Sequence, residues 1–162
     1  MPRQRKRVVP LPIRPGILLP LLAGFALMAA GLACATPDLG GGADTEATTL
    51  RVSADEPWTD TGLDLRLGDR VTIEYVSGEW SPWPGESYDA LGSGGDPRCD
   101  CNVILGVSHA ALIGRIGDGQ PFLVGEEYAG AAGETGRLYL GMNDTRLEDN
   151  SGSIRVRVQV LR

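Results

Sequence analysis

Residues 153–160 limit the fold strongly, because apolar and polar side chains alternate there one by one. The stretch reads SIRVRVQV, with isoleucine or valine at every second position and arginine or glutamine between. A period of two places all apolar side chains on one face of a β-strand, whereas a helix needs a period near 3.6. The stretch is therefore predicted to be a strand with one buried face.

Shorter runs with the same pattern recur along the chain. Residues 63–67 and 71–75 both alternate and are separated by a Gly-Asp pair, which predicts a β-hairpin. No window of 11 residues combines a helical period with helix caps, and Gly-rich segments separate the runs. Many short strands with regular turns predict an all-β fold, an antiparallel β-sandwich or jelly roll. Further strands are predicted at 50–53, 111–116, 121–124 and 137–142.

The first 34 residues are typical of an export signal. A basic head, MPRQRKR, precedes the apolar run 16–33, and Gly-Leu-Ala-Cys34 is similar to a lipobox, in which Cys34 becomes the lipidated N-terminus. Two alternatives stay open: cleavage after Ala35, giving a secreted or periplasmic protein, or an uncleaved anchor at 16–33. Each places the rest of the chain outside the cytoplasmic membrane. We expect an exported lipoprotein of the cell envelope, attached to the membrane only through this segment.

The rest of the chain divides into a tether and one domain. Residues 35–48 are small, polar and Gly-rich, which predicts a flexible tether, and residues 49–162 form the predicted folded domain. Five basic and no acidic side chains lie in 1–33, so the 15 basic and 21 acidic side chains of the whole chain leave 34–162 with a net charge near −11. Such a surface repels phosphate backbones, so we expect no nucleic-acid partner.

Signatures of enzymes are missing from the sequence. His109 is the only histidine, and we expect it to be a partly buried residue of a strand or loop rather than part of a catalytic relay. The chain also has no phosphate-binding Gly-Lys loop, no His-Glu-x-x-His pair and no Gly-x-Ser-x-Gly turn. We therefore expect a protein without enzymatic activity.

Cys99 and Cys101 are two residues apart in a domain expected to lie in an oxidising compartment. A local disulfide between them is the first interpretation, although a bridge of this spacing is strained. An intermolecular disulfide is the second interpretation. A soft-metal site formed with His109 is the third, and it would supply only three ligands.

The segment 143–153, Asn-Asp-Thr-Arg-Leu-Glu-Asp-Asn-Ser-Gly-Ser, places many oxygen atoms between two predicted strands. Calcium takes six to eight oxygen ligands from carboxylates, amides and main-chain carbonyls. Asp144, Asp149 and Asn150 can supply such side-chain oxygens. The spacing differs from that of an EF-hand, and a simple Asp/Asn turn between two strands is an equal alternative.

Three segments resemble the PA-IL-like lectins, a family of calcium-dependent, galactose-binding bacterial proteins. They are GDRVTIEYVSGEW at 68–80, ALIGRIGDGQPFLVG at 111–125 and GRLYLGMNDTRLEDNSGSIRVRV at 136–158. The resemblance implies a jelly-roll sandwich of the galactose-binding type and one bound Ca²⁺. It runs from about residue 52 to residue 160.

The resemblance also implies which residues act. The calcium ligands carried over from the family are side-chain oxygens of Asp144, Asp149 and Asn150, the carbonyl of Trp83, and the carbonyl of Arg146 or Leu147. The family's galactose-contacting histidine falls near Asp96 or Pro97, so that contact is not kept. The sugar-binding residues implied here are Asp96, Asp144, Asp149, Trp83 and Tyr88, with Trp83 or Tyr88 covering the apolar face of the sugar.

Together these observations predict a calcium-dependent carbohydrate-binding module in which two vicinal hydroxyls of a galactoside, or of another vicinal-diol sugar, complete the calcium shell. The alternative is a sandwich in which calcium only stabilises the loop and the partner is a protein.

Overall fold

The computed structural model describes residues 44–95 and 100–162. The predicted export signal with Cys34, most of the predicted tether, Asp96 and Cys99 lie outside the described residues. The described part of the chain contains no helix able to span a bilayer.

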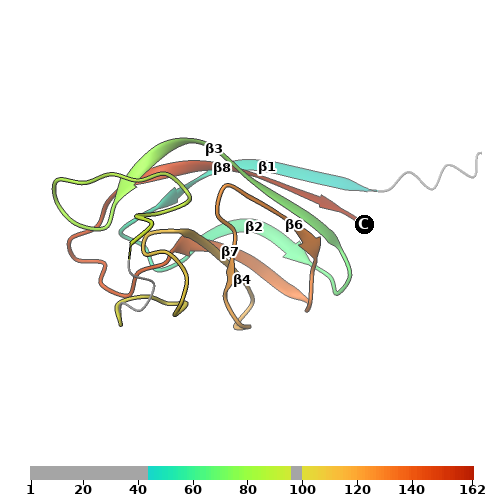
Figure 1. Cartoon of the computed structure of the whole chain (residues 1–162). Coiled ribbons are helices and arrows are strands. Elements are labelled where there is room, and N and C mark those ends of the chain that lie inside the picture. Colours follow the sequence, from blue (N-terminus) through green and yellow to red (C-terminus); the bar gives the residue numbers. More distant parts are fainter. Residues whose placement is uncertain (1–43, 96–99) are drawn as a thin grey trace, which may run out of the picture. The chain divides into compact units, whose positions relative to one another are not determined.

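The described residues form a β-sandwich of two four-stranded antiparallel sheets, as the sequence predicts. The strand order is β1-β8-β3-β6 in one sheet and β2-β7-β4-β5 in the other. Figure 1 shows the sheets as two layers, with long loops gathered at one end. The strands are β1 (Thr45–Ser53), β2 (Thr59–Leu65), β3 (Arg70–Ser81), β4 (Leu112–Ile116), β5 (Phe122–Leu123), β6 (Glu127–Ala131), β7 (Gly136–Met142) and β8 (Ser151–Leu161).

The core lies between the inner faces of the two sheets. The four apolar side chains at alternate positions of β8 from Ile154 to Val160 are fully buried, while the arginines between them are exposed, which confirms the strand predicted at 153–160. Ile73 of β3 lies opposite Val158 in the register of β3 and β8 and is also fully buried. Burial of apolar area is the main favourable contribution to folding, so these inward rows hold the sandwich together.

The predicted hairpin between 63–67 and 71–75 is wrong. The Gly68 turn is present, but β2 pairs with β7 and β3 pairs with β8 and β6, so the two strands belong to different sheets. Leu67, expected on the apolar face, lies in this turn and is 70% exposed. Alternation identifies a buried face but does not say whether two such faces lie side by side or opposite each other.

Two strands also differ from the prediction: one begins earlier than expected, and the other was not predicted. β1 begins at Thr45, inside the predicted tether 35–48, and its register with β8 runs from Thr45 opposite Leu161 to Ser53 opposite Ser153. β6 lies in a stretch that the sequence analysis treated as a Gly-rich separator. Both strands lie at an edge of their sheet, where only one neighbour constrains the sequence.

Four strand ends meet at one end of the sandwich. Ser81 at the end of β3 is opposite Ser151 at the start of β8, and Leu112 at the start of β4 is opposite Met142 at the end of β7. Loop 82–111 runs from β3 to β4 and loop 143–150 from β7 to β8, so both loops cross between the sheets at this end.

The long loop 82–111 is fastened to the sandwich by Trp80. Its indole is 1% exposed, and Nε1 donates a hydrogen bond to the carbonyl of Ala110 at 2.9 Å. The backbones of Trp80 and Tyr88 exchange two hydrogen bonds of 3.0 and 2.8 Å. At Gly92 the backbone of the loop packs closely against its own later part, at His109. The φ of Gly92 is +76°, and an added Cβ would lie 2.3 Å from the carbonyl oxygen of His109. The loop is held at several points along its length.

We expect Ile73→Ala to lower the free energy of unfolding by about 2–5 kcal/mol, because it leaves a cavity between the sheets. Val76→Ala on the same strand is the control, since Val76 is 51% exposed and its truncation should change the free energy little. Urea unfolding of both variants measures the difference. Equal midpoints for the two variants would contradict the proposed position of the core.

Candidate functional site

A pocket of about 300 Å³ opens between loops 82–111 and 143–150. It lies at the end of the sandwich where the four strand ends meet. Its lining is mixed: an aromatic ring, an imidazole, two carboxylates, one guanidinium and several small residues. The lining residues are Pro82, Trp83, Ser93, Gly95, Cys101, His109, Asp144, Arg146 and Asp149.

Asn143 joins the two loops. Its side chain is fully buried, and Nδ2 donates to the carbonyls of Ile104, Val107 and Ser108 at 3.2, 3.3 and 3.1 Å. Its Oδ1 accepts from the backbone N–H of Ile104 at 2.8 Å. Thr145 adds two bonds to the carbonyl of Cys101, from its backbone N at 2.7 Å and its Oγ1 at 2.9 Å. The start of loop 143–150 is thus fixed by protein contacts alone.

Asp144 follows this anchor and is 4% exposed. Its Oδ1 accepts a hydrogen bond of 2.8 Å from the backbone N–H of Arg146, which closes a tight turn. Its Oδ2 lies 3.7 Å from Nε2 of His109. Burying a carboxylate is costly unless hydrogen bonds or a positive charge compensate for it. The groups around Oδ2 therefore determine which ligand this carboxylate can bind.

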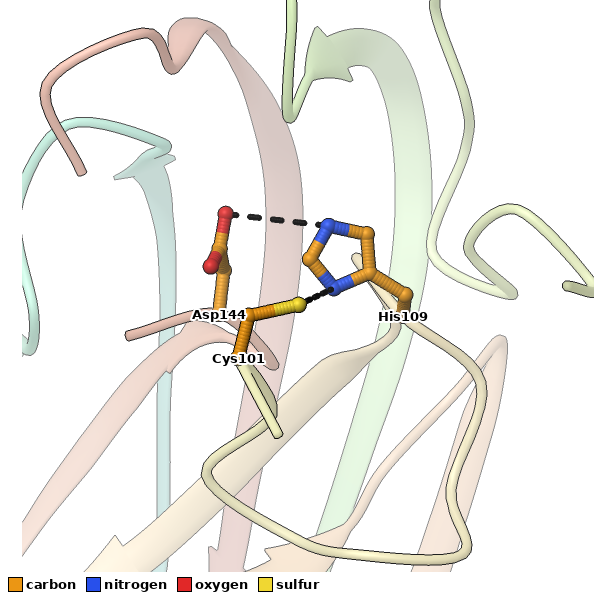
Figure 2. Close-up of side chains that lie close together, drawn as sticks. All are labelled: Cys101, His109 and Asp144. Atoms are coloured by element: carbon orange, nitrogen blue, oxygen red, sulfur yellow. Dashed lines mark hydrogen bonds and ion pairs between the residues drawn. The ribbon is translucent and has the colours of Figure 1, made fainter. Parts of the chain in front are cut away.

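His109 is held in one orientation by its neighbours. Asn102 donates from Nδ2 to the carbonyl of Val107 at 3.3 Å, which leaves its Oδ1, 2.7 Å from His109 Nδ1, to accept the Nδ1 proton. The ring stacks on Trp83 with centroids 5.3 Å apart and planes 6° apart. Nε2 is consequently the nitrogen turned toward Asp144 (Figure 2).

His109 lies in a loop and is 6% exposed, so it is more deeply buried than the partly buried strand or loop residue that the sequence predicts. Its contact with Asp144 was not foreseen, because the two residues are far apart in the sequence. No local sequence signal indicates this contact, because it forms only when loops 82–111 and 143–150 meet.

Cys101 Sγ lies 3.7 Å from His109 Nδ1, and its sulfur, the imidazole and the Asp144 carboxylate form a compact group (Figure 2). Their ligand atoms lie within 4.8 Å of one another. Cys101 is disulfide-bonded, however, and metals are bound by the thiolate form of cysteine. The group therefore does not provide the Cys ligand of the soft-metal interpretation. The pairing of Cys101 with Cys99 stays a prediction, since Cys99 lies outside the described residues.

Asn150 carries a buried oxygen without a partner. The residue is 9% exposed, and its Nδ2 donates to the carbonyl of Ala54 at 3.1 Å, which fixes the orientation of the amide. Among the described residues, no group donates a hydrogen bond to the Oδ1 on the other side of this amide. A buried amide oxygen left unpaired costs about 1–3 kcal/mol, so this atom calls for a ligand.

The other predicted oxygen donors lie around the same loop. Asp149 lines the pocket and is exposed. The carbonyl of Leu147 accepts one hydrogen bond, from the backbone N–H of Asn150 at 3.2 Å, and the carbonyl of Trp83 accepts one from Ser81 Oγ. Each carbonyl oxygen has a second lone pair. The donor set of carboxylate, amide and carbonyl oxygens is the kind that hard cations such as Ca²⁺ prefer.

The aromatic residues of the predicted sugar site have different surroundings. Trp83 lines the pocket, but His109 covers one face of its indole. Tyr88 is not among the residues that line the pocket; it meets Trp83 edge to face at 6.0 Å and 70°. Its hydroxyl donates a hydrogen bond to Glu86, which raises the pKa of Tyr88, with a smaller contribution from desolvation. Asp96 lies outside the described residues.

Comparisons with known proteins identify the fold. No family model and no curated protein matches the chain. A solved structure described as the EclA N-terminal domain, a PllA-like lectin, matches with a TM-score of 0.53 and 24% sequence identity. The match covers 69% of this chain and 94% of that one. At this identity, the likeness shows the shared β-sandwich.

We expect Asn143→Ala to lower the free energy of unfolding by about 1–3 kcal/mol, because it leaves the part-buried N–H of Ile104 without its acceptor. Asp118→Ala is the control, since the Asp118 side chain is fully solvent-exposed. Thermal unfolding of both variants gives the comparison. An Asn143→Ala variant as stable as Asp118→Ala would show that the two loops do not depend on this side chain.

Proposed function

We propose that the protein is a calcium-dependent carbohydrate-binding module, displayed outside the cytoplasmic membrane by its N-terminal segment. The observation that carries the proposal is the buried, unpaired Oδ1 of Asn150, on the same loop as two carboxylates that line the pocket. An amide oxygen and two carboxylates within seven consecutive positions form a donor set for a hard cation. No other arrangement in residues 44–95 and 100–162 offers this combination with an adjoining pocket.

The residues that would hold Ca²⁺ are Asp144, Asp149 and Asn150 through their side chains, and Trp83 and Leu147 through their carbonyls. Two carboxylates balance the charge of the ion, and the three neutral oxygens bring the protein ligands to five. Calcium takes six to eight oxygens, so this set leaves positions open. Bound Ca²⁺ would supply a Lewis-acidic centre at the pocket that can accept two neighbouring hydroxyls.

The shape of the pocket supports a sugar as the ligand. About 300 Å³ matches the lower end of small-molecule sites, and the lining joins an aromatic wall to polar groups. The solved neighbour with the same sandwich is described as a lectin. A galactoside, or another sugar with vicinal hydroxyls, is the ligand class we propose.

A purely structural role for calcium has less support. Asn143 and Thr145 already fix the start of loop 143–150 through protein hydrogen bonds. The loop therefore does not depend on an ion at that end, whereas the pocket beside it is open to a ligand. The structural alternative predicts a calcium response without any response to sugar.

We expect Ca²⁺ to raise the melting temperature of the protein, and Asp149→Ala to weaken calcium binding roughly tenfold or more, because one of two charged ligands is lost. Calorimetric titration with Ca²⁺ measures the affinity. Asp149 is exposed, so the variant should fold normally, and Asp118→Ala is the control of equal charge. An unchanged affinity in Asp149→Ala would contradict the proposed ligand set.

The sugar-binding part of the proposal is tested on a glycan array, with the protein applied once in Ca²⁺ and once in excess chelator. We expect binding that depends on Ca²⁺. A blank array in both conditions, with calcium still raising the melting temperature, would favour the structural alternative.

A further inference from the structure

Among the described residues, Arg146 brings the one guanidinium to the pocket lining. Its backbone is fixed beside the proposed calcium site, because its N–H donates to Asp144 Oδ1 at 2.8 Å. Its side chain extends from this anchor and is 71% exposed. The guanidinium is thus a solvent-exposed group at the rim of the pocket, carried by a backbone that is held beside the proposed calcium site.

The guanidinium has no strong partner within the described residues. Its one ion pair is with Asp100, at 3.9 Å between Nη2 and Oδ1, and the Asp100 side chain is 93% exposed. Solvent-exposed pairs at such a distance contribute little. Neither Asp144 nor Asp149, the acids of the pocket, forms an ion pair with Arg146. Five donors in a planar fork therefore remain available to a ligand.

The charge of the pocket changes when the cation site is filled. Asp144 and Asp149 contribute two negative charges, which a divalent cation balances. Among the described lining residues, Arg146 then contributes a positive charge at the rim, and its exposed partner Asp100 lies 3.9 Å away. The body as a whole is strongly acidic, so this local positive charge favours an anionic group on a bound ligand over one elsewhere on the surface.

We propose that the pocket selects acidic sugars, with Arg146 binding the carboxylate of a hexuronic acid whose vicinal hydroxyls occupy the cation site. This rests on the proposed function. Guanidinium and carboxylate match in a planar, bidentate geometry that a hydroxymethyl group cannot reproduce. In a hexuronic acid, the carboxylate is attached one ring carbon away from the C3–C4 diol. A single small sugar therefore carries both groups that the pocket would recognise.

The test compares methyl galacturonide with methyl galactoside, titrated by calorimetry into the full-length protein in Ca²⁺. The two sugars share the same ring hydroxyls and differ only at C6. We expect the uronide to bind roughly three- to tenfold more tightly in low salt, with the preference reduced at high salt.

Arg146→Gln should remove this preference, so that the ratio of the two affinities, both measured on the same variant, falls to about one. Arg157→Gln is the matched control, because it removes the same charge from the outer face of β8, away from the pocket. Equal affinity of the native protein for the two sugars would overturn the inference and leave the proposed function intact. A preference that survives Arg146→Gln would overturn the role of Arg146. Binding of neither sugar would overturn the inference together with the galactoside binding on which it rests.

Discussion

Packing of apolar side chains between two sheets is the constraint on which the rest of this structure depends. In this sandwich β3 pairs with β8 in one layer and β4 with β7 in the other, and the register of both pairs brings four strand ends to one place. Two loops that are far apart in the sequence are then forced together. The position of the pocket therefore follows from where these four strands begin and end.

Polar side chains give this junction its shape. Asn143 connects the loops with four hydrogen bonds, while Asn102 and Trp83 fix the ring of His109. These groups are satisfied within the protein, whereas among the described residues Asn150 Oδ1 is the one buried side-chain oxygen without a hydrogen-bond partner. Such preorganisation lowers the entropy cost of binding, since the site does not have to be ordered by its ligand. The paired and the unpaired polar atoms together indicate where a ligand belongs.

The sequence predicted much of the fold but little about which strands pair with each other. Period-two alternation identified the strand at 153–160, because a strand buried on one face has no other way to arrange its side chains. It could not assign 63–67 and 71–75 to separate sheets, since facing and neighbouring strands show the same alternation. Oxygen-rich residues 143–150 were recognisable as a candidate cation site from composition. His109 joined this site only through folding, which no local pattern reveals.

The central claim is that a calcium ion lies against the buried amide oxygen of Asn150. The most direct test is a crystal structure of the protein grown in Ca²⁺, with the ion located by anomalous scattering. The proposed site predicts a peak about 2.3–2.6 Å from Asn150 Oδ1, with Asp144 and Asp149 among its other ligands. A crystal in calcium with no peak there, and with Asn150 Oδ1 hydrogen-bonded to water or protein instead, would contradict it.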